Sequence, residues 1–319
     1  MRCVADYGGR VSPRPSPDRV PAPLLFLAGG VSMYVGAALA VGLFDRLAPS
    51  AVAELRLIGA ALLLLAWRRP GRDAWRGARL VRAGVFGLAT ALMNVAYYEA
   101  ISRLPLGTAV AVEFTGPVLV AALASRRFRD IGAVGLAAVG VLLIADVRWS
   151  GSPVGVLWAL GAAAMWAAYI VLGKRVARAG SGIDDLATGF TVAAVVLVPL
   201  LFVGGPGATT GFGVANLAPL ADPAVLALSI GLGVLSSLIP YVLDQVVLRR
   251  VGQARFAVLL ALLPATATLV GLVVLGQLPG TLEAVGIGLV VLAVALRSRD
   301  GDEPVPLPAT SVRDRAAPS

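Results

Sequence analysis

The sequence predicts an all-α membrane protein with ten transmembrane helices, arranged as two inverted halves of five helices each. Three observations predict this class. Hydrophobic residues make up 58% of the 319 residues and charged residues 14%, against about 45–50% and about 25% in soluble domains. The apolar residues fall in long blocks, and arginines gather in alternate connections between the blocks. Two interrupted blocks also resemble each other.

Composition excludes several classes of protein. A soluble globule of this length needs more charged residues to cover its surface, and a disordered chain has fewer apolar ones. The sequence has no histidine, and its one cysteine is Cys3. A disulfide framework, a Cys/His metal site and histidine-based catalysis are therefore excluded, and we expect no catalytic residue, metal or cofactor. The net charge of +9 is better explained by basic loops that orient membrane helices than by a nucleic-acid partner.

Ten apolar blocks are long enough to cross a bilayer, which takes about 20 residues per helix. The first block is too long for a signal-peptide core and lacks a small-residue cleavage site, so it is predicted as a true span. The predicted spans are 24–44, 49–67, 80–101, 107–125, 130–147, 153–173, 185–204, 223–247, 254–275 and 281–297. They form a first half over 24–147 and a second half over 153–297. The segments 1–23 and 298–319, rich in proline, are predicted as a disordered arm and tail.

The arginines predict the orientation. If the N-terminus is cytoplasmic, 23 of the 27 Lys and Arg residues fall in cytoplasmic segments. Only Arg46, Arg103 and Arg148 fall in external connections, and Arg56 lies within a span. This split follows the positive-inside rule. The sequence therefore predicts a multi-pass protein of the cell inner membrane with both termini in the cytoplasm.

A weak internal repeat relates the two halves. The block from Arg103 to Pro117 can be laid on the block from Arg250 to Pro264, at an offset of 147 residues. Each block has a basic residue, a short turn and then a helix interrupted by proline. Five spans per half give the halves opposite orientations in the membrane. Inverted repeats with a binding site at their interface are typical of secondary transporters.

Prolines inside three spans predict exposed backbone groups. Proline removes a hydrogen bond to the carbonyl four residues earlier, so Pro117, Pro240 and Pro264 free the carbonyls of Glu113, Ser236 and Leu260. In lipid such a carbonyl is tolerated only where protein or trapped water satisfies it. These helix breaks are therefore expected to face the bundle interior. A packing kink is the alternative for any one proline, but the matched pair Pro117 and Pro264 favours a shared central cavity.

Each ionisable residue within a span is expected to have a partner or a function, because a charge at the bilayer centre costs at least about 2.5–3.5 kcal/mol. Glu99 is expected to pair with Arg103 four residues later. Glu54 and Arg56 lie near the outer end of their span and are expected to snorkel to water. Two residues apart, they point to different helix faces, and Arg56 is a candidate for a carboxylate or substrate across the bundle.

Glu113 has a different sequence environment, because no basic residue lies within four positions of it. It is the main candidate for binding a proton or a substrate ammonium group. Asp244 is a second candidate, with an interfacial ion pair to Arg249 or Arg250 as its alternative. Further candidates for lining a cavity, or for packing and the interfacial belt, are Asn94, Tyr97, Tyr98, Trp166, Tyr169 and Tyr241. Close helix contacts are expected at Gly29, Gly30, Gly132, Gly135, Gly140, Gly286 and Gly288.

Three stretches carry a family resemblance: 105–117 (PLGTAVAVEFTGP), 165–174 (MWAAYIVLGK) and 235–244 (LSSLIPYVLD). They resemble the threonine/homoserine exporter group, in the EamA-type branch of the drug/metabolite transporter superfamily. The resemblance covers about 24–297. It implies two EamA repeats and an inner-membrane exporter of amino acids or related small metabolites, driven by the proton gradient through alternating access. Its partners would be an amino-acid-like substrate, protons and membrane lipids; a homodimer is left open.

Two departures from the family pattern bear on substrate and coupling. The family has Glu just before the proline of the ninth span and near the end of that span, where this chain has Leu263 and Gln277. Asp244 stands where Glu is expected. Three other functions are weighed: a transporter of sugar phosphates, nucleotide sugars or lipid carriers, an intramembrane enzyme, and a structural or regulatory membrane protein. A transporter of phosphorylated substrates or lipid carriers requires a basic cavity. An intramembrane enzyme requires a nucleophile with a base, or a metal cluster, and the sequence has neither.

Overall fold

The computed structural model describes residues 20–123, 128–149, 152–177, 182–204, 211–240, 243, 246–247, 259–260 and 262–298. Within these ranges the chain is all-helical, and its only β-type pairing is an isolated bridge between Val203 and Phe212. Apart from Ser298, the predicted tail at 298–319 lies outside the described residues, as do residues 1–19 of the predicted arm at 1–23 and the candidates Tyr241 and Asp244.

The first half of the chain forms six helices and a short 3₁₀ turn. They are α1 (Ala22–Val41), α2 (Pro49–Arg68), η2 (Arg72–Trp75), α3 (Gly77–Ile101), α4 (Leu106–Glu113), α5 (Thr115–Leu123) and α6 (Phe128–Trp149). Helices α1 and α2 have proline in their first turn, where its missing N–H would have no helical partner anyway. The predicted fourth span is divided at Phe114 into α4 and α5.

The second half is less regular. Its elements are α7 (Pro153–Ala177), α8 (Gly182–Leu197), η3 (Val198–Phe202), η4 (Val214–Ala221), α9 (Pro223–Gly233), a π-helical turn η5 (Val234–Leu238), α11 (Leu262–Leu275) and α12 (Thr281–Ser298). Each of the predicted spans overlaps a helix of the described part, and most boundaries agree within a few residues. The two 3₁₀ turns outside the spans, η2 and η4, were not predicted.

Length and apolar composition identify candidates for crossing a membrane. In the described ranges five helices qualify: α1, α2, α3, most of α7, and α8 continued into η3. A sixth is obtained if the bent pair Val214–Ala221 and Pro223–Leu238 counts as one span. Four shorter apolar helices cover Leu106–Val120, Ile131–Ile144, Leu262–Leu275 and Thr281–Leu296. The chain is thus a polytopic helical protein whose apolar segments are of membrane type.

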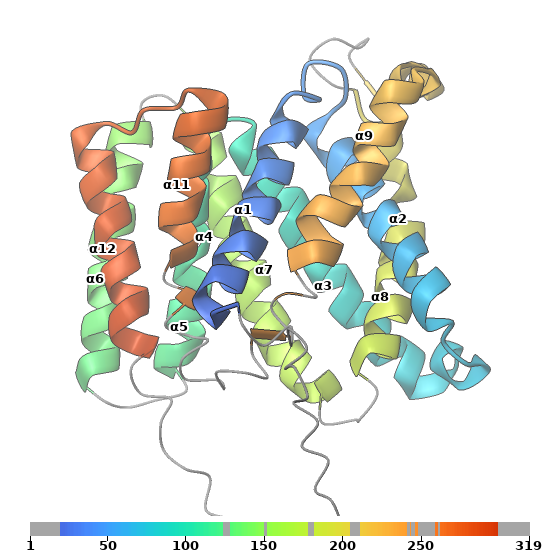
Figure 1. Ribbon diagram of the computed structural model, residues 1–319, viewed down its shortest axis with the longest axis horizontal. Helices are drawn as coiled ribbons and strands as arrows, with labels where there is room; N and C mark the ends of the chain where they lie inside the picture. The colour runs from blue at the N-terminus through green and yellow to red at the C-terminus, as the bar shows by residue number, and fades with distance from the viewer. Residues whose placement is uncertain are drawn as a thin grey trace, which may run out of the picture.

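The helices stand side by side in an elongated bundle (Figure 1). Helices α6, α11 and α12 lie toward one end of its long axis and α2, α8 and α9 toward the other, with α1 and α7 between them (Figure 1). The main packing pairs join the two halves of the chain: α6 with α12, α3 with α7 and α8, α2 with α8 and α9, and α1 and α4 with α11. Helix α1 begins and α12 ends on the same face (Figure 1), called the terminal face below.

Glycines permit some of these crossings. A Cβ on Gly140 would lie 2.7 Å from the carbonyl oxygen of Gly286, and the converse distance is also 2.7 Å, so α6 and α12 touch backbone to backbone. Gly30 is equally tight, because its Cβ would lie 2.9 Å from Leu263 Cδ2. The predicted close contacts at Gly30, Gly140 and Gly286 are confirmed, whereas a Cβ on Gly29 would make an ordinary contact, 3.5 Å from Leu243 Cβ. The prediction is wrong for Gly132, Gly135 and Gly288, where nothing of the described protein lies within 4 Å of the position a Cβ would take.

Ion pairs tie helices together at both faces. On the terminal face Arg68 Nε pairs with Asp184 at 2.9 Å and Arg79 Nε with Asp185 at 2.7 Å, which joins α2 and α3 to the start of α8. On the opposite face Arg46 pairs with Asp222 at 2.9 Å. Asp222 caps α9 by accepting the Ala224 N–H, and this bond, followed by Arg46, lowers the pKa of the Asp222 carboxyl.

Candidate functional site

Arg56 is held inside the bundle by three hydrogen bonds. Its Nη1 donates to Asn94 Oδ1 at 2.9 Å and its Nη2 to the Ser236 carbonyl at 2.8 Å, while Nε donates to Ser237 Oγ at 3.2 Å. The guanidinium also lies 5.5 Å from the centre of the Tyr98 ring, within the range of a cation–π interaction. The prediction that Arg56 snorkels to water is therefore wrong, because partners from α3 and η5 hold it inside.

The Ser236 carbonyl is available because the helix is irregular there. Pro240 has no N–H for a bond to this carbonyl, and the preceding residues form the π-helical turn η5. Such single-turn π segments are frequent at functional sites. Ser32 Oγ donates to the neighbouring Leu235 carbonyl at 2.8 Å, which ties η5 to α1 as well. The prediction that Pro240 frees a carbonyl facing the interior is confirmed, and Arg56 is its partner.

Glu113 lies at the second irregular point, where α4 ends. Phe114 separates α4 from α5, and Thr115 Oγ1 donates to the Val112 carbonyl at 2.7 Å. Glu113 is 8% exposed, and what is exposed faces the cavity described below. In the described part of the chain neither Glu113 nor Arg56 has a carboxylate or cation within salt-bridge distance.

Both residues line one cavity of about 450 Å³, within the range typical of small-molecule sites. Its walls come from α1, α2, α3, the α4–α5 break, α7, α8, η5 and the start of the segment leading into α11. The predicted residues that it collects are Arg56, Asn94, Tyr97, Glu113, Pro117, Trp166, Tyr169 and Pro240. Pro264 is buried nearby but is not a wall residue, whereas Leu260, whose carbonyl it was predicted to free, is one.

The cavity has a polar and an apolar part. Its polar groups include Ser236, which the sequence singled out only for its carbonyl, and Thr90 and Ser237, which it did not single out. Apolar side chains form most of the remaining wall. Trp166 packs edge-on against Phe114 at 4.6 Å, and Tyr169 stacks on Phe86 at 4.9 Å. These contacts fix the aromatic wall, as the ring geometries are favourable ones.

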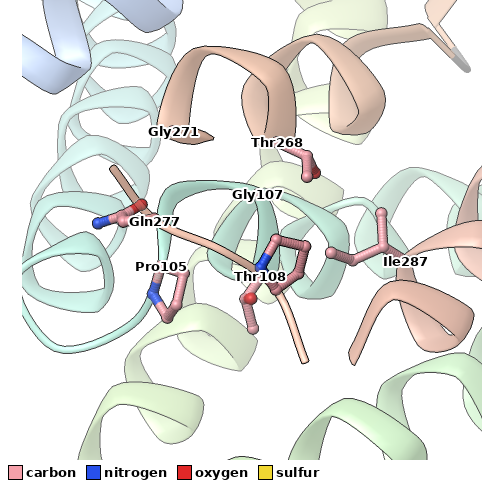
Figure 2. A pocket seen from close by; sticks show the side chains of 8 residues that line it. Pro105, Gly107, Thr108, Thr268, Gly271, Gln277 and Ile287 are labelled. Carbon is pink, nitrogen blue, oxygen red and sulfur yellow. The ribbon is translucent and has the colours of Figure 1, made fainter. Parts of the chain in front are cut away.

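The two departures from the family pattern have separate roles. Leu263 lines the cavity against α1 and makes this wall apolar. Gln277 lies away from the cavity, in the connection between α11 and α12, beside a small pocket (Figure 2). Its Oε1 accepts the backbone N–H of Leu106 at 2.9 Å, so it caps the start of α4. Gln277 thus replaces an acidic residue at a structural contact, not at the polar part of the cavity.

The same corner contains a buried carboxyl. Glu283 of α12 is fully buried and accepts a hydrogen bond from Thr108 Oγ1 of α4. Its other oxygen lies 3.3 Å from the Gly280 N–H, a bond that caps α12. Thr108 and Gln277 both border the small pocket (Figure 2). Gln277 and the pair Thr108–Glu283 together fasten α4 to the α11–α12 hairpin. No spacing rule connects Thr108 with Glu283, because 175 positions separate them.

Two glutamates near helix ends behave differently. The predicted pair of Glu99 and Arg103 is confirmed, with Arg103 Nη1 at 2.6 Å from Glu99 Oε2. Glu99 Oε1 also accepts the Ser50 N–H at 3.2 Å. Glu54 was predicted to reach water, and this is wrong: its exposed fraction is 0%.

Among the described residues, no three His, Cys, Asp or Glu side chains are grouped to hold a metal ion.

Comparisons with known proteins identify relatives of this sequence. The sequence profile of the EamA-like transporter family matches residues 153–299. The threonine/homoserine exporter RhtA of Salmonella typhimurium (strain SL1344) is 35% identical over 257 residues, covering 80% of this chain and 83% of that protein. RhtA of Escherichia coli (strain K12) is 33% identical over 273 residues, covering 85% of this chain and 88% of that protein. The similarity therefore extends well beyond the second half of the chain.

Proposed function

The chain belongs to the EamA-like transporter family, and from this membership and its cavity we propose that it exports amino-acid-like metabolites across the inner membrane. The observation that carries the proposal is one guanidinium and one carboxyl, Arg56 and Glu113, in the wall of the same cavity. Neither is neutralised by a direct partner in the described ranges. A ligand with both charges is therefore the natural counterpart.

Arg56 is suited to a carboxylate. A guanidinium has five N–H donors, and the three bonds to Asn94, Ser236 and Ser237 use one on each nitrogen. One donor remains on Nη1 and one on Nη2, and both are available to the oxygens of a carboxylate. Because the existing bonds fix the guanidinium plane, little side-chain entropy is lost when a ligand binds. Glu113 then takes the ammonium group of the same ligand.

The charge balance of the cavity favours an amino acid over a phosphorylated substrate. Arg56 is its one basic wall residue and Glu113 its one acidic wall residue, among the residues described. A zwitterion leaves this balance neutral. A sugar phosphate or nucleotide sugar brings at least two negative charges, which a single arginine facing a carboxyl compensates poorly. The cavity volume of about 450 Å³ leaves room for side chains larger than that of threonine.

The helix packing supports an inverted repeat in two halves. By their order in the chain, α7 and α8 of the second half correspond to α1 and α2 of the first, and α9 with η5 corresponds to α3. Helix α3 packs on α7 and α8, and α9 with η5 packs on α1 and α2 in the same way. Helices α4 and α5 pack on α7, and the equivalent α11 packs on α1. Three further contacts each join a helix of the first half to the corresponding helix of the second half. They are α6–α12, α4–α11 and α2–α8. These reciprocal contacts are those that a two-fold axis in the membrane plane produces, as in other secondary transporters.

The shape of the cavity supports alternating access. Wall residues continue toward the terminal face as far as Leu64, near the end of α2, and Leu186, near the start of α8. Toward the opposite face the wall ends at Tyr97, beyond which Tyr98 and Phe44 are buried in edge contact at 6.0 Å. With the terminal face in the cytoplasm, as the arginines predict, this is an inward-facing state. Proton entry in exchange for substrate would then return the empty carrier.

Flux measurements in inside-out vesicles test the proposal. We expect labelled threonine, homoserine or a larger amino acid to accumulate in vesicles that contain the protein. Accumulation should increase when the lumen is acidic, because protons leaving the lumen drive the exchange. Vesicles without the protein are the control. Absence of flux for every amino acid tested, with correctly inserted and folded protein, would instead indicate a structural or regulatory membrane protein.

A further inference from the structure

Glu54 is a buried carboxyl that the proposed binding site does not use. It lies about a turn and a half into α2, has an exposed fraction of 0%, and is not among the wall residues of the cavity. Neither of its carboxylate oxygens has a hydrogen-bond partner in the described part of the chain. By contrast, Glu99, also near a helix end, is bonded to Arg103 and to the Ser50 N–H.

The position of Glu54 on α2 explains its isolation. Successive residues advance by about 100° around a helix, so Glu54 and Arg56 lie about 160° apart, on opposite faces. Ala61, two turns along, shares the face of Glu54, and it packs in a cluster with Ala91 of α3 and Ala193 of α8. Glu54 therefore points toward the packed α3–α8 side, and Arg56 points into the cavity.

In the described part of the chain, Glu54 forms no ion pair. Helix α2 packs against α3, α8, α9, η3 and η5. In the described residues, η3 and η5 contain no ionisable side chain, and α9 has only Asp222 at its cap. The charged residues of α8, Asp184 and Asp185, lie at the terminal face beside Arg68 and Arg79. In the half of α3 that accompanies Glu54 the titratable groups are Tyr97, Tyr98 and Glu99, and Glu99 is paired with Arg103 just after the helix. Arg46, in the connection before α2, is paired with Asp222.

An ionised carboxylate in this place would lack both water and a counter-charge. Burial of a charge without a partner is unfavourable enough that the group takes its neutral form instead. The Tyr98 hydroxyl, also buried without a hydrogen-bond partner, adds no compensating charge. Glu54 is thus a group that binds a proton without needing the substrate, at a position that does not line the cavity.

We propose that Glu54 is a second proton-binding site of this protein, separate from the cavity, whose ligand is a single proton. It holds the proton in the present conformation and exchanges it with water when α2 parts from α3 and α8. The step is a simple protonation of a carboxylate oxygen, with water as the donor or acceptor. The inference rests on the proposed function for its role in transport, but the protonation itself can be measured without transport.

Infrared difference spectroscopy of the reconstituted full-length protein tests the protonation directly. The wild type minus Glu54→Gln spectrum at neutral pH should contain the C=O stretch of a carboxylic acid and no carboxylate stretches. Glu99→Gln is the matched control, because its ion pair with Arg103 should give carboxylate stretches. Carboxylate stretches for Glu54 would overturn the proposal. Should Glu54→Gln fail to fold, Glu54→Met, which is similar in volume and cannot titrate, takes its place in the same comparison.

Transport measurements test the role of this proton. Glu54→Gln should exchange internal for external amino acid at the wild-type rate, since exchange moves no net proton. Its accumulation driven by a proton gradient should fall at least about tenfold, which is 1.4 kcal/mol of lost coupling. Gradient-driven accumulation equal to that of the wild type would overturn the proposal. If the wild type neither exchanges nor accumulates any amino acid, the proposed function fails, and the infrared result still decides whether Glu54 holds a proton.

Discussion

Replacing Arg56 by Gln is expected to remove binding of amino acids almost completely. The substitution eliminates the two free N–H donors on Nη1 and Nη2 and leaves the ligand carboxylate desolvated without a counter-charge. Loss of one partner of a buried, hydrogen-bonded charge pair costs about 2–5 kcal/mol, so the affinity should fall at least about 30-fold. Arg56→Lys should recover little of this, because an ammonium lacks the planar fork of donors. Ligand titrations of the purified variants measure the effect.

The matched control for Arg56 is Arg46→Gln. Arg46 lies in the connection between α1 and α2, at the face opposite the terminal face. Its ion pair with Asp222 is exposed, and it does not line the cavity. Its replacement should leave affinity unchanged. Because Arg56 also bonds Asn94 and Ser236, each variant needs a thermal unfolding curve to separate lost binding from lost fold. A folded Arg56→Gln with wild-type affinity would place the carboxylate site elsewhere.

Glu113→Gln is expected to keep expression and folding but to abolish or uncouple export. Glutamine preserves the volume of the side chain and its capacity for hydrogen bonds, so packing at the α4–α5 break should survive. It can neither hold a counter-charge for the substrate ammonium nor exchange a proton. Export should therefore fall by at least about tenfold, and whatever remains should no longer respond to external pH. The measurement is efflux from loaded vesicles across a series of external pH values.

Glu99→Gln is the comparison for Glu113→Gln. Its carboxyl lies outside the cavity, paired with Arg103 four residues away, and such a helical pair contributes only a few tenths of a kcal/mol. Efflux and its pH response should stay close to those of the wild type. If instead Glu113→Gln exported at the wild-type rate with unchanged pH dependence, Glu113 would have no part in transport.

Local rules predicted part of the site from the sequence. A proline inside a helix always leaves the carbonyl four residues earlier without its helical hydrogen bond. The free carbonyl of Ser236 therefore followed from the position of Pro240 alone. The pair Glu99–Arg103 followed from helical spacing in the same way. The helix break at Phe114 was likewise indicated by Pro117. Each of these features depends on residues within one turn or so, where the helix geometry is known in advance.

Contacts between distant helices were not predictable by such rules. Arg56 and Ser236 are 180 positions apart, and no spacing argument joins them. Glu54 was expected at water because it lies near a helix end, but the rotation of α2 buries it. The sequence does not specify this rotation, since α2 has apolar residues on nearly all sides. Gln277 at the start of α4 and the open surroundings of Gly132 depend on tertiary packing in the same way.

The most direct test of the central claim, that Arg56 and Glu113 hold the two charges of an amino acid, uses blocked ligands. Thermal unfolding of the solubilised wild type is measured with a free amino acid that it transports, with the N-acetyl form and with the carboxamide. A ligand at 100 times its Kd stabilises the protein by about 2.7 kcal/mol. The free amino acid should give this stabilisation, and both blocked forms at the same concentration should give almost none. Equal stabilisation by all three would contradict the claim.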